Sequence, residues 1–308
     1  MLAVLLTIIG VGLACLAYAS LVERNWFALR THRVPCLPTG TPAVRVLHIS
    51  DLHFRRGQRR KRAFLARCAT TNPDLVVGTG DFLGGADAVE ATVDAMTQIR
   101  PRTSAFFVLG SNDYYGSTPT NPFKYLVGPS NRHKPKGRPN PWRDLVAGLQ
   151  ERGWRLINNE TANLTLDGFG PVDIVGLDDP HLRRDDLSVA SPRSHEGFRL
   201  AIVHSPDAAP ALAALGYDLI VCGHTHGGQL RVPGFGALVT NSTLPRTMAR
   251  GLHRLDGAWL HVSAGMGTNP YAPVRFACRP EACLLELVPR EETGTQAVPE
   301  RMRSKQRR

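Results

Sequence analysis

Five segments of the sequence each end a short apolar, β-rich run with residue types that bind metals, and this series restricts the possible folds more than any other feature. The five ends are Asp51-Leu52-His53, Gly80-Asp81, Asn112-Asp113, His204 and His224-Thr225-His226. One such end carries little weight, because a buried histidine is more often a hydrogen-bonded core residue than a ligand. In open α/β sheets, however, ligands bind at the carboxyl ends of the strands. Five such ends in one chain therefore predict an α/β fold with a metal site at these strand ends.

The spacing within the motifs suits a site for two ions. In Asp51-Leu52-His53 and in His224-Thr225-His226 one residue separates two ligand types, and in extended backbone residues i and i+2 point to the same face. Two divalent ions about 3.5 to 4 Å apart need oxygen and imidazole ligands from separate strands, together with a carboxylate that bridges them. The five motifs together supply this set of donors.

The rest of the sequence reads as strands alternating with helices. Helices are expected at about residues 58–69 and 86–98, and strands at 44–49, 75–77 and 105–109. Further strands are expected at 154–157, 163–166, 172–176, 198–203, 218–222, 258–263 and 282–288. Residues 116–143 contain many Pro, Asn, Gly and Lys without periodicity, which predicts an inserted surface loop.

The amino-terminal segment carries no charge from Leu2 to Val22. A helix of this length rises roughly 31 Å, enough to cross a hydrocarbon core of about 30 Å, so a single membrane pass is the favoured interpretation. A cleaved signal peptide is the alternative, since residues 17–19 read Ala-Tyr-Ala, and a buried core helix is a third. No Lys or Arg precedes the run, whereas positive residues follow it at Arg24, Arg30 and Arg33. This asymmetry predicts an uncleaved anchor with the rest of the chain on the cytoplasmic face.

Composition divides the chain into four parts. Residues 1–22 are expected to form the membrane anchor, 23–42 a proline-rich linker, 43–289 one folded domain and 290–308 a disordered basic tail.

Basic residues outnumber acidic ones by 37 to 26, which gives a formal charge of +11. This surplus permits binding to phosphate groups, anionic lipid or nucleic acid without choosing among them. A basic cluster directly follows the first motif and consists of Arg55, Arg56, Arg59, Arg60, Lys61 and Arg62. It is either a solvated helix face or a contact for anionic lipid headgroups. Nucleic acid is disfavoured because no aromatic residues interleave with the cluster, and the sequence has no GxxxxGK motif, which argues against an NTPase.

In order and type, these motifs resemble the calcineurin-like metallophosphoesterase superfamily over about residues 43–288. The resemblance implies an α/β fold, a four-layer αββα sandwich, with two divalent ions such as Mn, Fe or Zn. By position, one ion would be held by Asp51, His53, Asp81 and His226, and the other by Asp81, Asn112, His204 and His224. Asp81 would bridge the ions, and Asp81, Asn112 and His204 would serve catalysis. The chain is most similar to the membrane-anchored bacterial branch, because its last motif continues as Gly227-Gly228-Gln229.

The third motif departs from the family pattern Gly-Asn-His-Asp, since this chain has Gly110-Ser111-Asn112-Asp113. Without a gap, Ser111 occupies the position of the amide ligand and Asn112 that of the histidine that protonates the leaving group. An amide oxygen binds a hard metal better than a hydroxyl does, so we expect the turn to shift by one residue and Asn112 to be the ligand. In either register that histidine is missing, which favours leaving groups that need little protonation.

Motifs and resemblance together imply a membrane-tethered phosphoester hydrolase that depends on two metal ions. The expected reaction is in-line attack by a hydroxide between the two ions on a phosphodiester or pyrophosphate of a small-molecule or lipid-linked substrate. The alternatives are a phosphomonoesterase or phosphoprotein phosphatase, and a catalytically silent membrane scaffold of the same fold.

Overall fold

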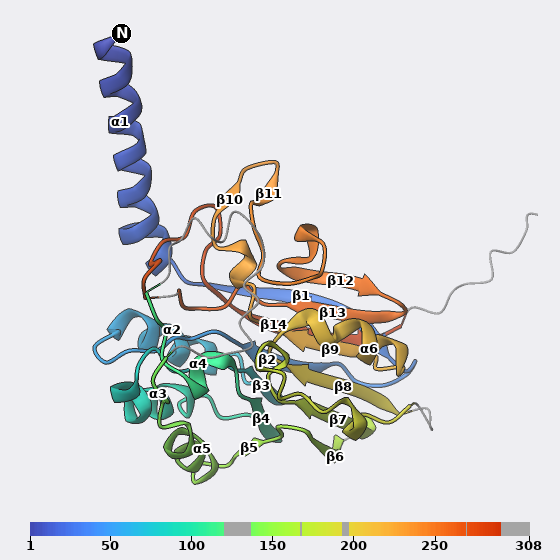
Figure 1. The fold of residues 1–308 in the computed structure, drawn as a ribbon. Helices are drawn as coiled ribbons and strands as arrows, with labels where there is room; N and C mark the ends of the chain where they lie inside the picture. Colours follow the sequence, from blue (N-terminus) through green and yellow to red (C-terminus); the bar gives the residue numbers. More distant parts are fainter. Residues whose placement is uncertain (120–136, 167, 193–196, 269, 291–308) are drawn as a thin grey trace, which may run out of the picture.

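Two six-stranded β-sheets pack face to face in the computed structural model of the chain (Figure 1). The structure describes residues 1–119, 137–166, 168–192, 197–268 and 270–290. A hydrophobic layer of side chains from both sheets fills the space between them, including Val46, Val77, Leu200 and Val221. Each sheet therefore buries one face against the other, which is the arrangement of a β-sandwich.

The first sheet contains the strands expected at residues 44–49, 75–77, 105–109, 154–157 and 282–288. Its strand order is β1 (Ala28–Leu37), β14 (Glu281–Pro289), β2 (Val44–Ile49), β3 (Leu75–Thr79), β4 (Ser104–Val108) and β5 (Trp154–Leu156). Strands β2 to β5 are parallel, β14 is antiparallel to β2, and β1 is parallel to β14. The parallel strands end together, so their carboxyl-terminal loops meet at one edge.

The second sheet has the same mixed character. Its order is β12 (Gly251–Leu255), β13 (Ala258–Val262), β9 (Leu219–Cys222), β8 (Phe198–Val203), β7 (Gly170–Leu177) and β6 (Glu160–Leu166). The four central strands are parallel, whereas β12 and β6 are antiparallel edge strands. A separate two-stranded hairpin consists of β10 (Arg231–Val232) and β11 (Gly236–Ala237).

Helices cover the outer faces of both sheets and complete the predicted four-layer αββα sandwich. The first sheet is covered by α2 (Arg59–Ala69), α3 (Val89–Met96) and α5 (Trp142–Gln150), and the second by α6 (Ala209–Ala214). Short helices occupy Ser111–Tyr114 (α4), Ala86–Ala88, Pro180–Leu182, Leu187–Val189, Pro206–Ala208, His226–Gly228 and Arg246–Met248. The fold class predicted from the motifs is thus confirmed.

The amino-terminal helix α1 (Leu2–Ala17) extends away from the sandwich (Figure 1). It continues as a π-helical turn over Tyr18–Val22 and a 3-10 turn over Glu23–Asn25, so the helical segment spans 24 residues, and an 18-residue stretch within it has a mean hydropathy of 2.4. By length and composition it can cross a membrane, although a signal sequence has the same properties. Its side chains are exposed, so it is not a core helix of the sandwich.

The predicted linker over residues 23–42 is wrong for its central part, because residues 28–37 form strand β1 and pair with β14. The prolines suggested a linker, but β1 is an edge strand that pairs on one side only, and Pro35 lies beside a register shift. Edge strands and bulges are the places where a sheet accepts proline. The folded domain therefore begins before residue 43.

Two other expectations changed in part. The loop predicted over residues 116–143 ends within helix α5, which buries Leu145, Val146 and Leu149 against the first sheet. Residues 120–136 of that loop and residues 291–308 of the predicted tail lie outside the described residues. The first tail residue, Arg290, donates its backbone N–H to the carbonyl of Leu37 and thus extends the contact between β14 and β1.

Candidate metal centre

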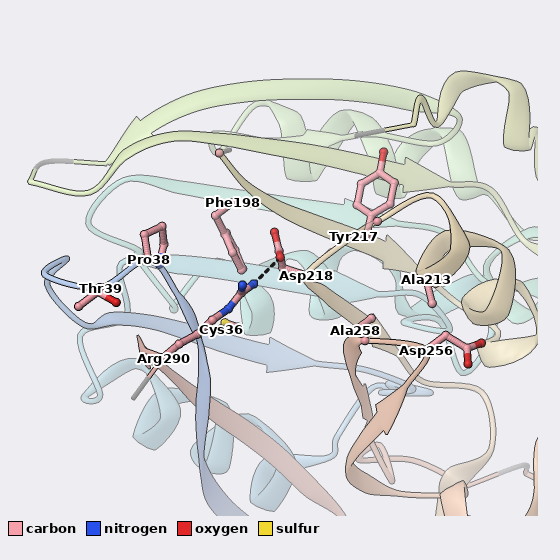
Figure 2. A pocket seen from close by; sticks show the side chains of 13 residues that line it. Cys36, Pro38, Thr39, Phe198, Ala213, Tyr217, Asp218, Asp256, Ala258 and Arg290 are labelled. Carbon is pink, nitrogen blue, oxygen red and sulfur yellow. Dashed lines mark hydrogen bonds and ion pairs between the residues drawn. The ribbon is translucent and has the colours of Figure 1, made fainter. Parts of the chain in front are cut away.

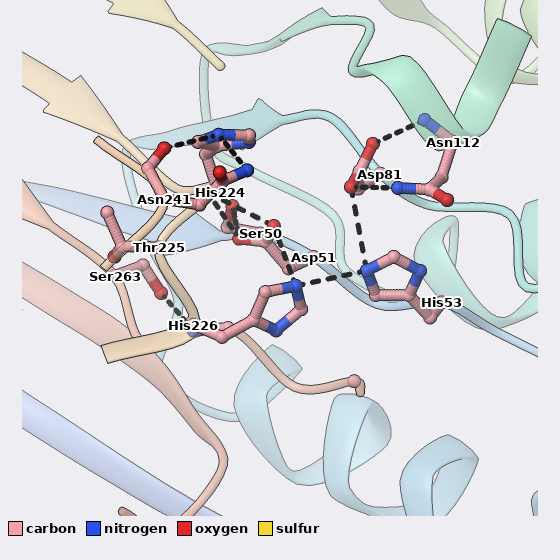
Figure 3. A network of polar contacts seen from close by, with 12 residues as sticks. Ser50, Asp51, His53, Asp81, Asn112, His224, Thr225, His226, Asn241 and Ser263 are labelled. Atoms are coloured by element: carbon pink, nitrogen blue, oxygen red, sulfur yellow. Dashed lines mark hydrogen bonds and ion pairs between the residues drawn. The ribbon is translucent and has the colours of Figure 1, made fainter. Parts of the chain in front are cut away.

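All seven predicted ligands gather at the carboxyl ends of the parallel strands, where the loops of both sheets meet. Figure 3 labels all of them except His204. Strands β2, β3 and β4 supply the first three motifs, and β8 and β9 supply the last two. Five of the seven ligands have positive φ angles, namely Asp51, His53, Asp81, His224 and His226. Such angles are uncommon outside glycine, and they turn the chain sharply so that side chains from separate strands point at one another.

The first half of the site brings together four ligands whose donor atoms all lie within 4.8 Å of one another: Asp51, His53, Asp81 and His226. His53 Nε2 lies 3.3 Å from His226 Nε2 and 3.5 Å from Asp81 Oδ2. His226 Nε2 lies 3.7 Å from Asp51 Oδ1. Two carboxylates and two imidazoles at this spacing fit one divalent ion.

The second half of the site shares Asp81 with the first. His204 Nε2 lies 3.6 Å from Asp81 Oδ1 and 3.2 Å from His224 Nδ1. The Asn112 backbone N–H donates to Asp81 Oδ1 and its side-chain amide donates to Asp81 Oδ2, both at 2.7 Å. Asp81 Oδ1 therefore faces His204 and Oδ2 faces His53, while Asn112 donates to both oxygens, so the carboxylate lies between the two halves of the site. The structure brings together every residue that the sequence predicted for the site.

Hydrogen bonds behind the ligands orient two of the imidazoles. His204 Nδ1 lies 2.6 Å from the carbonyl of Thr79, and His224 Nε2 lies 2.9 Å from the carbonyl of Asn241. A carbonyl only accepts, so these ring nitrogens carry the protons. The opposite nitrogens, His204 Nε2 and His224 Nδ1, face the site, and His204 Nε2 would give up its proton when a metal binds.

The electrostatics of the site concentrate negative charge on Asp81. Burial alone would raise the pKa of Asp81, but His204, His53 and the hydrogen bonds from Asn112 hold it below its usual range. Burial would lower the pKa of His204, yet Asp81, Asp179 and Asp51 together raise it to about 9. Burial raises the pKa of Asp51 to about 6. A divalent cation would take over the charge compensation that His204 now provides.

In the third motif, the side chain that reaches Asp81 is that of Asn112. Its amide nitrogen faces Asp81, while its oxygen accepts a hydrogen bond from Ser117 Oγ at 2.8 Å. Rotation of the amide by half a turn would place the oxygen at Asp81 and let the nitrogen donate to the serine hydroxyl. This contact favours the shifted register, with Asn112 as the ligand, over ligation by Ser111. Ligation by Asn112 stays a prediction.

Asp113 is a functional residue that the sequence analysis passed over. Its buried carboxylate accepts hydrogen bonds from the backbone N–H groups of Asp81, Phe82, Leu83 and Gly110. The carboxylate thus clamps the loop after β3 to the loop after β4 and fixes the position of Asp81. Its place as the last residue of the third motif was the available signal.

His181 and Asp179 also approach the site from the loop after β7. The ring centroids of His181 and His224 are 5.0 Å apart, and Asp179 is fully buried with its Oδ2 unpartnered. Burial raises the pKa of Asp179 to about 7. Asp179 caps this turn by accepting a hydrogen bond from the His181 N–H. Its negative charge also raises the pKa of His204.

Arg275 links the site to the amino-terminal helix. Its guanidinium is fully buried, donates to the carbonyls of Ala264 and Gly267, and lies 3.5 Å from His226 Nδ1. Its backbone N–H donates to the carbonyl of Ala19 at 3.1 Å. Arg275 therefore contacts both the end of the predicted membrane segment and the predicted metal ligand His226.

The basic cluster lies beside the contact between Arg275 and the amino-terminal helix. One of its members, Lys61, differs from the predicted solvated or lipid-facing surface. Its five arginines are exposed, whereas Lys61 is buried and donates to the carbonyl of Leu52. Burial lowers the pKa of Lys61 to about 7. Phe64 of α2 stacks on Phe27 with ring centroids 5.2 Å apart, which holds the helix against the residues that follow the amino-terminal helix.

A cavity of about 550 Å³ lies elsewhere in the sandwich and holds none of the predicted ligands. Cys36, Phe198, Tyr217 and Ala258 contribute to its lining, and the ion pair between Arg290 and Asp218 crosses it at 2.8 Å (Figure 2). Because the residues with metal-binding chemistry gather at the strand ends instead, the cavity is not the active site.

Comparison with known proteins agrees with this geometry. Residues 44–228 match the family model described as calcineurin-like phosphoesterase. The chain is 26% identical to the phosphodiesterase YaeI of Escherichia coli over 275 residues, which cover 88% of this chain and 92% of that protein. It is 24% identical to the uncharacterized metallophosphoesterase YkuE of Bacillus subtilis over 278 residues, with 88% of each chain covered. It is 27% identical to the UDP-2,3-diacylglucosamine pyrophosphatase LpxG of Chlamydia trachomatis over 283 residues, which cover 79% of this chain and 83% of that protein.

Proposed function

The chain belongs to the calcineurin-like phosphoesterase family and is a metal-dependent phosphoester hydrolase, and we propose that it is a membrane-tethered enzyme for phosphodiesters or pyrophosphates. The observation that carries the proposal is the convergence of six donor residues around Asp81. Asp51, His53 and His226 cluster with this carboxylate within 4.8 Å. His204 and Asn112 also contact it, and His224 lies beside His204.

We propose that these two groups each hold one divalent ion. Two such ions supply Lewis-acid chemistry, because they neutralise charge on the phosphoryl oxygens and lower the pKa of a water molecule. The residues contribute the positioning. Asp81 separates the two groups by a fixed distance, and Asp113 holds the Asp81 backbone in place through hydrogen bonds. His204 faces the site with Nε2, and Asn112 offers an amide beside Asp81.

The location of the site supports a substrate at the membrane surface. The carbonyl of Ala19 and the carboxylate of Glu23 accept hydrogen bonds from the loop that carries Arg275. The β10–β11 hairpin is tied to the same loop through Arg231 N–H and the carbonyl of Phe276. In Figure 1 the hairpin projects from the sandwich toward the end from which α1 leaves.

This hairpin carries apolar side chains in the open. Phe235 at its turn is 64% exposed, and Leu230, Val232 and Leu238 are each about two-fifths exposed. Exposed apolar groups beside a membrane-spanning helix suit contact with acyl chains or the bilayer interface. A phosphorylated amphiphile could then present its phosphate to the site without leaving the bilayer, which supports a lipid-linked substrate such as a diacylated nucleotide sugar. The positive residues after α1 support a cytoplasmic orientation.

The bond class follows from the missing acid of the third motif. No histidine stands at Ser111 or Asn112, so an alkoxide leaving group lacks the usual proton donor. A phosphate or aryl oxide leaves as an anion and needs no proton. This difference favours pyrophosphates and activated diesters over simple phosphomonoesters or phosphoproteins.

The test is hydrolysis of bis(p-nitrophenyl) phosphate and of a lipid-linked pyrophosphate, together with metal analysis, for the wild type and Asp81→Asn. We expect the wild type to bind two divalent ions in this site and to cleave both substrates, because Asp81 contacts both groups of ligands. Asp81→Asn should lose metal and nearly all turnover while circular dichroism remains unchanged. Full activity with two bound ions in Asp81→Asn would contradict the assignment.

A further inference from the structure

A second cluster of metal-ligand side chains lies between the two sheets, apart from the candidate metal centre. The ligand atoms of His32, His261 and Cys283 all lie within 4.8 Å of one another. His261 and Cys283 are fully buried, and His32 is partly buried at the edge of the sandwich. We call these three residues the inter-sheet site. None of them belongs to the five motifs from which the sequence predicted a metal centre.

The strand register explains why three residues so far apart in sequence meet. β1 runs parallel to β14, with Arg30 opposite Cys283, so His32 lies two residues along from this position on the same face of β1. His261 comes from β13 of the opposing sheet, and its ring centroid lies 5.2 Å from that of His32. The site therefore joins the two sheets across the hydrophobic layer.

Two nitrogen atoms in the cluster have no hydrogen-bond partner. Nε2 of His32 and Nε2 of His261 are both buried and unpartnered. A buried polar atom without a partner costs about 1 to 3 kcal/mol, so two such atoms in one layer need an explanation. A ligand that accepts electron pairs from both nitrogens would remove this cost.

The hydrogen bonds around His261 leave it in the form that a metal binds. His261 Nδ1 lies 2.9 Å from His48 Nδ1, and His48 Nε2 lies 2.9 Å from Thr79 Oγ1. The Thr79 hydroxyl donates to Ser50 Oγ at 2.6 Å, and the Ser50 hydroxyl donates to Asp51 Oδ2 at 2.5 Å. Since both hydroxyl protons are used in this direction, Thr79 accepts from His48 Nε2–H, and His48 Nδ1 accepts from His261 Nδ1–H. His261 Nε2 is then an unprotonated donor atom, as in metal-ligating histidines oriented by a neighbour.

We propose that His32, His261 and Cys283 form a structural Zn²⁺ site, separate from the catalytic ions. Two imidazoles and one thiolate are borderline-soft donors that select Zn²⁺ over Mg²⁺, Ca²⁺ or Mn²⁺. Binding converts the Cys283 thiol to the thiolate and releases one proton to solvent. Glu281 neighbours Cys283, and its negative charge is offset by Arg30, whose Nε lies 2.6 Å from the Glu281 carboxylate. The bound ion staples β1 and β14 to β13 and orders the hydrogen-bonded chain that ends at Asp51.

The experiment uses the full chain in detergent under reducing conditions, stripped with a chelator and then loaded with Co²⁺ in place of Zn²⁺. We expect a thiolate-to-cobalt charge-transfer band in the near ultraviolet, because the candidate metal centre contains no cysteine. The band should persist in Asp81→Asn, in Cys36→Ser and in Cys278→Ser, and should vanish in Cys283→Ser. Cys36 is the matched control, since it is a buried cysteine on β1 that faces the same hydrophobic layer.

Metal analysis after loading with Zn²⁺ gives the second measurement. Cys283→Ser should lose one equivalent of Zn²⁺ per chain relative to Cys36→Ser. The wild-type cobalt spectrum decides the matter even if Cys283→Ser fails to fold, since absence of the charge-transfer band would overturn the proposal. Persistence of the band in folded Cys283→Ser would overturn it as well. A chain that shows the band but no hydrolysis would support the inter-sheet site and refute only the proposed function.

Discussion

Glu23 fastens the end of the amino-terminal helix to the loop beside the candidate metal centre, and we predict a large effect from its removal. Its side chain is 3% exposed, and its carboxylate accepts hydrogen bonds from the backbone N–H groups of Ala277, at 3.0 Å, and Cys278. A hydrogen bond to a charged group contributes about 1.5 to 3 kcal/mol. Loss of both in Glu23→Ala should therefore lower the free energy of unfolding by about 3 to 6 kcal/mol.

The same substitution should disturb the metal centre. Ala277 has a φ of 51°, a conformation that costs a non-glycine residue about 1 to 2 kcal/mol, and the Glu23 carboxylate holds it there. Once released, the loop can relax, and Arg275 two residues earlier loses its fixed place beside His226. We therefore expect reduced metal occupancy in addition to reduced stability.

Urea denaturation of the detergent-solubilised chain, followed by tryptophan fluorescence, measures the stability, and metal analysis measures the occupancy. Glu160→Ala is the control, because this exposed glutamate on β6 should change the free energy of unfolding by no more than about 0.5 kcal/mol. Glu23→Gln keeps one acceptor oxygen and should lie between the wild type and Glu23→Ala. A loss below about 1 kcal/mol in Glu23→Ala would refute the reasoning, since it would mean that water replaces the carboxylate at no cost.

Three further predictions follow from the site and its surroundings. Asn112→Ala should lower metal content more than Ser111→Ala does, and the reverse ranking in metal analysis would favour the ungapped register of the third motif. A chain lacking residues 2–17 should still bind anionic vesicles in low salt and dissociate in high salt, whereas reversal of Arg56 and Arg59 to glutamate should release it at both; unchanged binding would leave the cluster as a solvated face. Across a series of aryl and alkyl diesters, turnover should fall as the pKa of the leaving group rises, and each tenfold loss corresponds to about 1.4 kcal/mol of activation barrier. Turnover that does not depend on the leaving-group pKa would point to His181 as a proton donor.

The sequence predicted the strands around the site well because each is a short apolar run that ends at a motif. The first motif follows β2 and the second follows β3, as expected from buried, nearly continuous apolar segments. Strand β1 was missed because its prolines and charged residues have no clear alternation. What makes residues 28–37 a strand is the free edge of β14, a partner more than 240 residues away that no local pattern reveals.

The inter-sheet site shows the same limit more sharply. His48 is a packed strand residue, fully buried and within hydrogen-bond distance of Thr79 and His261. His32 and His261 belong to no motif, because His32 lies on β1 of the first sheet and His261 on β13 of the second. Their proximity depends on how the sheets pack, which sequence spacing does not encode.

The metal centre behaves as one unit because each motif is held by another. Asp51 N–H donates to the carbonyl of Gly80, His53 N–H donates to the carbonyl of Asp81, and His224 N–H donates to the carboxylate of Asp51. These three donors belong to residues with positive φ, each of which costs about 1 to 2 kcal/mol. Together with the same cost at Asp81 and His226, the strain reaches about 5 to 10 kcal/mol, comparable to the whole stability of a domain.

Such strain persists only where the surrounding structure over-determines it. The hydrogen bonds supply this constraint by joining the loop after β2 to the loops after β3 and β9, which lie in different sheets. A change that moves one sheet relative to the other would therefore release several strained residues at once. The packing between the sheets therefore contributes to the position of Asp51, because hydrogen bonds run from His261 through His48, Thr79 and Ser50 to its carboxylate.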